Sequence, residues 1–154
     1  MKKILCSLLA AVSLLSNAWA ASEKLSKLGV TFTPPSGWTE RHKREQKEGL
    51  TLEAFFYVSP DQDALIMVTC SEMPKEMFDN AINYWTSQFG FYDPVPIAGV
   101  QGYVFKVKSP QGAVIKQYHL YKNGKAYTID YTEKSTEGKH LPEFEAALKS
   151  FNIS

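Results

Sequence analysis

The alternation of large apolar and polar residues is clearest between residues 112 and 132. Two β-rich runs there are joined by the sequence Lys122-Asn123-Gly124-Lys125. Asn-Gly accepts positive φ at both central positions of a type I′ turn, whose twist matches that of paired strands. In the second run, Tyr127, Ile129 and Tyr131 alternate with Ala126, Thr128 and Asp130. The pattern predicts a β-hairpin whose second strand is half-buried.

Four further runs show β character: residues 30–33, 50–58, 64–70 and 100–108. The run 64–70 is continuously apolar, which is typical of a strand near the middle of a sheet covered on both faces. The polar run 41–48 predicts an exposed loop or a strand end that projects into solvent. The alternative for that run is a basic docking patch, although Glu45 and Glu48 reduce its charge.

Two segments have helical periodicity. Residues 74–89 begin with proline, which suits a first helical turn, and are followed by Gly90 as a stop signal. A second helix is predicted to open at Pro142. Between the two helices, residues 91–96 contain two prolines and are predicted to form a stiff loop. The apolar faces are Phe78, Ala81, Ile82, Trp85 and Phe89 in the first helix, and Leu141, Phe144, Leu148 and Phe151 in the second.

The predicted order is three strands, a helix, three strands and a helix. The connections between strands are short enough for hairpins, so the sheet is expected to be mainly antiparallel. Helices packed on such a sheet give an α+β class, with about six strands.

This order of elements, with several local sequences, resembles the PsbP-like and DcrB-like group of α/β/α sandwich proteins. The likeness rests on residues 30–38, where a strand leads into Pro34, Pro35 and Gly37-Trp38, and on the hairpin at Asn123-Gly124. It extends through the closing Lys149-Ser150-Phe151 and covers most of residues 28–153. The resemblance implies an α/β/α sandwich with an antiparallel sheet. The characterised members of the group bind another macromolecule without catalysis, and the resemblance implies the same for this chain. No site residue transfers from the group to this chain.

The N-terminus has the pattern of a secretory signal. A short basic start precedes an apolar run at 4–15, and Ala18-Trp19-Ala20 places small residues where a signal peptidase cleaves, before Ala21. The run is shorter than the roughly 20 residues that span a bilayer, which argues against a membrane anchor. The other alternative is a lipoprotein in which Cys6 is the acylated residue. We therefore expect residues 1–20 to be a cleaved signal and 21–154 a single domain, in the bacterial periplasm or secreted.

Removal of the signal would take away Lys2 and Lys3 and change the net charge from +1 to −1 with histidines neutral. A charge so close to zero gives no electrostatic basis for nucleic-acid binding. No apolar run after residue 20 is long enough to span a membrane.

The sequence shows no phosphate-binding glycine loop, no Gly-x-Ser-x-Gly elbow and no His-Glu-x-x-His motif. The histidines, at 42, 119 and 140, lack the short spacing of metal ligands, and we predict no catalytic residue, cofactor or metal. Cys70 is expected to be a buried small hydrophobe; a reactive thiol, an intermolecular disulfide, or a thiolate pair with His119 are the alternatives. Asp61 and Asp63 predict a solvated turn, with calcium binding as the alternative.

Aromatic residues in predicted loops are the remaining candidates for function. Trp38, Phe91 and Tyr92 lie beside prolines or glycines, and aromatics are enriched at binding sites. The alternative is that these rings cover the core. The first hypothesis is a non-enzymatic binding or accessory module that docks to a protein partner in the cell envelope. The second is a carrier of a small apolar ligand held between helix and sheet.

Overall fold

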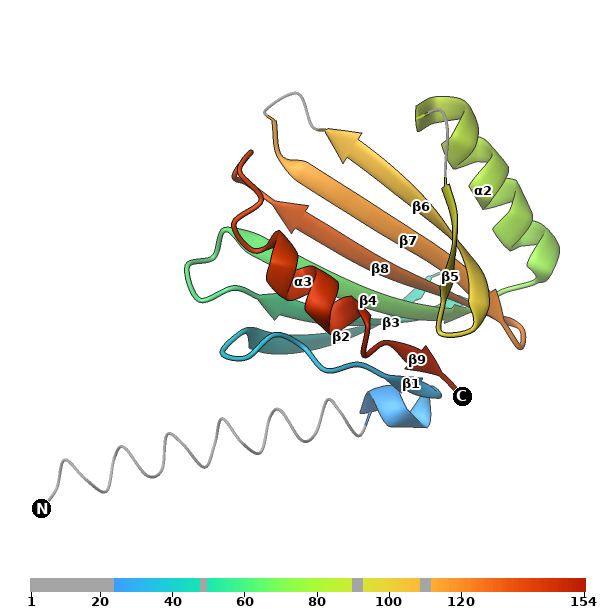
Figure 1. Cartoon of the computed structure of the whole chain (residues 1–154). Coiled ribbons are helices and arrows are strands. Elements are labelled where there is room, and N and C mark those ends of the chain that lie inside the picture. Colours follow the sequence, from blue (N-terminus) through green and yellow to red (C-terminus); the bar gives the residue numbers. More distant parts are fainter. Residues whose placement is uncertain (1–23, 48–49, 90–92, 109–111) are drawn as a thin grey trace, which may run out of the picture.

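The computed structural model describes residues 24–47, 50–89, 93–108 and 112–154. Its centre is a seven-stranded antiparallel sheet (Figure 1). In spatial order the strands are β2 (Thr39–Lys47), β3 (Leu50–Val58), β4 (Ala64–Glu72), β8 (Lys125–Glu133), β7 (Val114–Lys122), β6 (Val100–Lys108) and β5 (Asp93–Ile97). The α+β class and the mainly antiparallel sheet are confirmed, with seven strands in place of about six.

The two faces of the sheet are covered differently. One face packs against α3 (Leu141–Leu148) and a two-stranded sheet of β1 (Val30–Thr31) and β9 (Asn152–Ile153), which lie in front of it in Figure 1. The other face packs against α2 (Lys75–Phe89), through Phe78 and Ile82. Within the described residues, no helix is both long and apolar enough to cross a membrane.

The predicted hairpin is confirmed as β7 and β8. Asn123 and Gly124 have φ of 52° and 78°, as the type I′ turn requires, and Lys122 pairs with Lys125 across the turn. The tyrosines and isoleucine of β8 are fully or almost fully buried, so β8 supplies the centre of the core.

Both edges of the sheet differ from the prediction. The polar run after Trp38 forms the nine-residue strand β2, paired with β3 along its whole length. An edge strand can keep polar side chains in solvent while its partner supplies the backbone pairing, so this sequence needs no apolar face. At the other edge, residues expected in a stiff loop form β5, whose Pro94 and Pro96 are tolerated because an edge strand has one unpaired side.

The helices agree with the prediction except at their ends. Phe78 and Ile82 are buried and Trp85 is half-buried, while the side chain of Phe89 lies outside the described part. The second helix ends at Leu148, so Phe151 lies beyond it although it remains buried in the core. Hydrogen bonds with three-residue spacing, such as that from Phe151 N–H to the Leu148 carbonyl, tighten the chain there and end the α-helix.

Candidate functional site

A groove runs between the extended segment 33–36 and the outer side of α3. The helix contributes Glu143, Ala146 and Ala147, whose spacing places them on one face, and Ser150 follows just beyond its end. Pro34 and Pro35 are among the residues of the opposite wall. The groove is open to solvent and has a volume of about 620 Å³.

Hydrogen bonds hold the groove at both ends. At one end, Thr33 N–H donates to Ser150 Oγ at 2.8 Å, and Ser150 Oγ donates to the Ala147 carbonyl at 2.6 Å. At the other end, Trp38 Nε1–H donates to Glu143 Oε2 at 2.8 Å. Between these ties the helix presents only alanine side chains, so a hollow remains that larger side chains would have filled.

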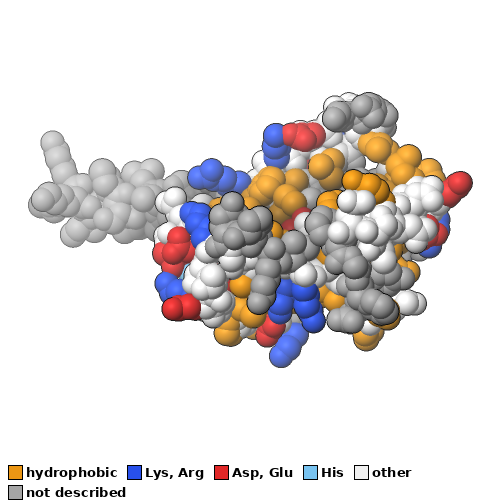
Figure 2. All heavy atoms as spheres, turned by 90° about the horizontal axis from the view of Figure 1, so that it is seen from above, with side chains coloured by type: hydrophobic (Ala, Val, Ile, Leu, Met, Phe, Trp, Pro, Cys, Tyr) orange, Lys and Arg blue, Asp and Glu red, His pale blue; other side chains and the backbone are white. Residues whose placement is uncertain are grey.

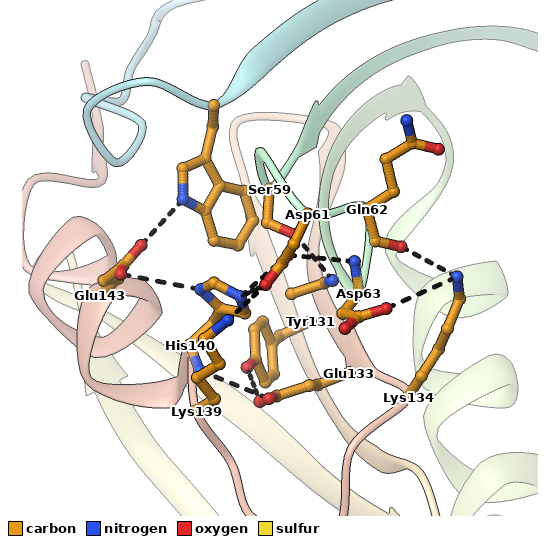
Figure 3. A network of polar contacts seen from close by, with 12 residues as sticks. Ser59, Asp61, Gln62, Asp63, Tyr131, Glu133, Lys134, Lys139, His140 and Glu143 are labelled. Carbon is orange, nitrogen blue, oxygen red and sulfur yellow. Dashed lines mark hydrogen bonds and ion pairs between the residues drawn. The ribbon is translucent and has the colours of Figure 1, made fainter.

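A second pocket, of about 330 Å³, adjoins the groove and shares Ser36 and Glu143 with it. Its other lining residues are Trp38, Pro60, Asp61, Lys139 and His140. Figure 3 shows the polar cluster around it, with the turn between β3 and β4 facing the start of α3.

Asp61 is the centre of this cluster. Its carboxylate accepts hydrogen bonds from Lys139 Nζ at 2.6 Å and from Ser59 Oγ at 2.7 Å, and His140 Nε2 lies 2.9 and 3.0 Å from its two oxygens (Figure 3). These donors, Lys139 first, hold the pKa of Asp61 well below its usual range. The hydrogen bond to Asp61 in turn raises the pKa of His140.

A buried carboxylate lies below Asp61. Glu133 is fully buried and accepts a hydrogen bond from the Tyr131 hydroxyl, while His140 N–H donates to Glu133 Oε1 at 3.4 Å. Burial, together with the bond to Glu133, raises the pKa of Tyr131. The indole of Trp38 packs edge-on against the imidazole of His140, with ring centres 5.7 Å apart. The cluster thus joins the loop before β2, the β3–β4 turn and α3.

The cluster contains Ser, His and Asp, but they are not arranged as a nucleophile, base and orienting acid. Ser59 and His140 both bond to the carboxylate of Asp61, so the acid lies between the serine and the histidine. Ser59 is also buried, and its Oγ accepts a hydrogen bond from Ala64 N–H at 2.9 Å. Nucleophilic catalysis requires the serine oxygen to reach both its base and a substrate. The geometry instead fits a polar tie between chain segments.

The predicted binding aromatics have different outcomes. Trp38 is buried, with 8% of its surface exposed, and its ring forms part of the core as well as a wall of the second pocket. Phe91 and Tyr92 lie outside the described residues. A role of any of the three in partner binding stays a prediction.

The structure also tests whether Cys70 could act with His119. Cys70 is buried, as predicted, and burial raises the pKa of its thiol to about 11. Residues paired across strands share a face of the sheet, and Cys70 pairs with Tyr127, which in turn pairs with Leu120. His119 precedes Leu120 on the same strand, so its side chain lies on the opposite face of the sheet from Cys70. A thiolate pair between Cys70 and His119 is thus excluded by the sheet itself.

Asp61 and Asp63 do not converge with a third acidic, histidine or cysteine side chain into a metal-binding group, and no such group of three or more occurs within the described ranges. Asp61 is instead occupied by Lys139 and His140. The sequence did not reveal this pairing, because His140 lies 79 positions and Lys139 78 positions after Asp61. The one local signal is their position just before the proline that opens α3.

No family model matches the chain, and no curated protein matches it. Several solved structures do, among them the following two. The solution structure of cyanobacterial PsbP (CyanoP) from Synechocystis sp. PCC 6803 has a TM-score of 0.58 and 15% identity, over 83% of this chain and 88% of that one. A crystal structure of a protein from Bacteroides thetaiotaomicron VPI-5482 has a TM-score of 0.57 and 15% identity, over 82% of this chain and 45% of that one. The chain therefore spans less than half the length of the Bacteroides protein, and the likeness to both structures shows a PsbP-like fold.

Proposed function

We propose that this chain is a non-enzymatic binding module of the bacterial periplasm, or a secreted one, that docks to another protein of the cell envelope. Its N-terminal signal pattern and its PsbP-like fold support this role. The observation that carries the proposal is the open groove between segment 33–36 and α3, because nothing in the described part of the chain fills it.

The chemistry of the groove defines the segment that it would take. Its floor is formed by alanines and its wall by prolines, so it favours an extended stretch with small apolar side chains. One end carries the carboxylate of Glu143, which is half-exposed and lies next to Asp61 in the adjoining pocket. A basic residue of the partner would be placed against the exposed side of Glu143, because Asp61 is already paired with Lys139 and His140.

Site-specific photocrosslinking tests this docking. A benzophenone amino acid in place of Ala146, an exposed position in the groove, is expected to capture one dominant envelope protein in cells that express the full chain. The matched control carries the same probe in place of Asn83, an exposed position on α2. Equal capture from both positions, or none from Ala146, would contradict docking in the groove.

A second candidate function, carriage of a small apolar ligand between α2 and the sheet, is favoured by one observation. His119 Nε2 and Asp130 Oδ1 are buried without a hydrogen-bond partner in the described structure. Both lie on the face that α2 covers, where His119 packs between Trp85 and Phe105 at ring-centre distances of 6.3 and 5.4 Å. Burial lowers the pKa of His119 to about 4 and raises that of Asp130 to about 6. Unpartnered polar atoms in an apolar interior are suited to fixing the polar end of a ligand.

The carrier hypothesis predicts that a small molecule co-purifies with the native protein. Organic extraction followed by mass spectrometry is expected to recover it, and the same extraction after unfolding, washing and refolding provides the control. Recovery of nothing from freshly purified protein would exclude this second function and leave the docking proposal unaffected.

A further inference from the structure

The two edges of the main sheet offer different opportunities for pairing. β5 has five residues and carries two prolines, which lack the backbone N–H that a pairing strand needs. β2 has nine residues and no proline, and within the described residues it pairs only with β3. An unpaired edge of this length can accept another strand through backbone hydrogen bonds.

One face of β2 carries exposed basic side chains. Arg41 and Lys43 are paired with Phe56 and Ala54 of β3, which places them on the side of the sheet opposite α3. Lys43 also contacts Glu45, two residues along the same strand. A strand added beside β2 would therefore bring every second side chain close to Arg41 and Lys43.

The other face of β2 leads into a basic pocket of about 310 Å³. Its lining residues are Lys24, Lys27, Leu28, His42, Arg44 and Glu53. The carboxylate of Glu53 is already hydrogen-bonded to His42 Nε2 at 2.6 Å and forms an ion pair with Arg44 Nε at 3.2 Å. Lys24, Lys27 and Arg44 give three formal positive charges against this one negative charge. The remaining side chains of an added strand would point to this pocket.

We propose that the edge of β2 binds an extended acidic segment of a partner protein by strand addition. Both faces of β2 present positive charge, so acidic side chains on either side of the added strand find complementary partners. β2 carries four Lys and Arg side chains against two Glu, so a second copy would bring one net positive strand beside another, whereas an acidic segment complements its charge. The proposal goes beyond docking in the groove, because it concerns a separate surface with the opposite charge preference.

The test uses the mature chain and synthetic peptides of nine residues, the length of β2. A peptide of alternating Glu and Val is expected to bind, to shift the backbone amide resonances of residues 39–46, and to slow their hydrogen exchange. A peptide of alternating Lys and Val is expected not to bind. A third peptide has the same acidic charge but carries prolines in place of two valines; it is expected to lose binding, since it cannot complete the backbone ladder.

Charge variants complete the test. R41E with K43E is expected to weaken binding of the acidic peptide by about tenfold or more, because two exposed attractions become repulsions. The matched control is K134E with K149E, which makes the same change of charge at exposed positions outside β2 and its pocket and should bind as the parent does. Equal binding of the proline peptide, amide shifts that leave β2 unaffected, or a β2-paired dimer of the chain would each overturn the proposal, whatever the outcome of crosslinking in the groove.

Discussion

At Asp61, one carboxylate accepts hydrogen bonds from side chains that lie in two distant parts of the sequence. Ser59 is its neighbour in the β3–β4 turn, while Lys139 and His140 directly precede α3. Their convergence fixes the turn against the start of the helix. Since Trp38 packs on His140 and bonds to Glu143, the end wall of the groove depends on the same contacts.

The buried carboxylate beneath this cluster gives the first prediction for stability. Glu133→Ala leaves the Tyr131 hydroxyl and the His140 N–H without their acceptor inside the protein. We expect a loss of about 2–4 kcal/mol in the free energy of unfolding, measured by urea denaturation, because buried donors then lack partners and a cavity forms. Glu137→Ala, at an exposed position in the same loop, should change it by no more than about 0.5 kcal/mol. Similar losses in the two variants would show that the Glu133 network contributes little.

At the level of the elements, two glycines in the sheet region are required for different reasons. Gly124 has a φ of 78° in the hairpin turn and open space around the position of a Cβ atom. Gly102 lies in β6, where a Cβ atom would meet Leu120 Cδ2 at 2.7 Å and the Val95 carbonyl oxygen at 3.3 Å. The first glycine is needed for backbone conformation, the second for the close approach of β5 and of the core.

This difference predicts an order of stability. Gly124→Ala should cost about 1 kcal/mol through backbone strain alone. Gly102→Ala should cost about 1–3 kcal/mol, since Leu120 is fully buried and has little room to move aside. Urea denaturation of both variants measures the order, and the amide spectra of β5 and β6 should change only in Gly102→Ala. A smaller cost for Gly102→Ala than for Gly124→Ala would contradict the packing argument.

The elements that the sequence predicted well are those with local signals. The hairpin is specified by Asn123-Gly124 and alternation, and α2 by its proline, its apolar stripe and its glycine. The edge strands were missed because β2 has no apolar face and β5 contains prolines, so only their pairing with a neighbour shows that they are strands.

The candidate site was less accessible to sequence reasoning for a similar reason. Trp38 was identified as a candidate from its neighbouring glycine, but its contacts with His140 and Glu143 join residues more than 100 positions apart. The groove itself results from two alanines on α3 that meet the proline segment 33–36 only in the folded chain. Neither feature has a pattern within any one segment.

On the scale of the whole molecule, a nearly neutral sequence separates its charges between surfaces. The groove ends at the half-exposed carboxylate of Glu143, while the edge of β2 and its pocket are basic. Hydrophobic side chains also reach the surface on the right of Figure 2, the side on which α2 lies. On α2 itself, Met77 and Tyr84 are 46% and 61% exposed. The surfaces therefore differ in the chemistry of the partner that each would accept.

Partly or fully buried ionisable groups on both sides of the sheet also predict how the stability of the whole protein depends on pH. Burial raises the pKa of Glu40 to about 7 and of Asp130 to about 6, and the bond to Asp61 raises that of His140. The stability contributed by these three groups is fully present below their ordinary pKa values and is lost as the pH rises through the raised ones. The lowered pKa of His119 acts in the opposite direction, but only below its ordinary value of 6.5. The melting temperature should therefore fall between pH 6.5 and pH 8, as measured by circular dichroism.

Glu40 provides the variant that separates this effect from the rest of the molecule. It lies on β2 opposite Tyr57, and its Oε1 is buried without a hydrogen-bond partner in the described structure. Glu40→Gln keeps the size of the side chain but cannot ionise, so it should melt above the parent at pH 8, where the parent must hold a partly buried carboxylate. At pH 4, below the ordinary pKa of 4.5, Glu40 is mostly protonated in both the folded and the unfolded parent, and the two melting temperatures should nearly coincide. The exposed Glu137→Gln should follow the parent at every pH. A gap between Glu40→Gln and the parent that is independent of pH would show that Glu40 acts through packing rather than through its charge.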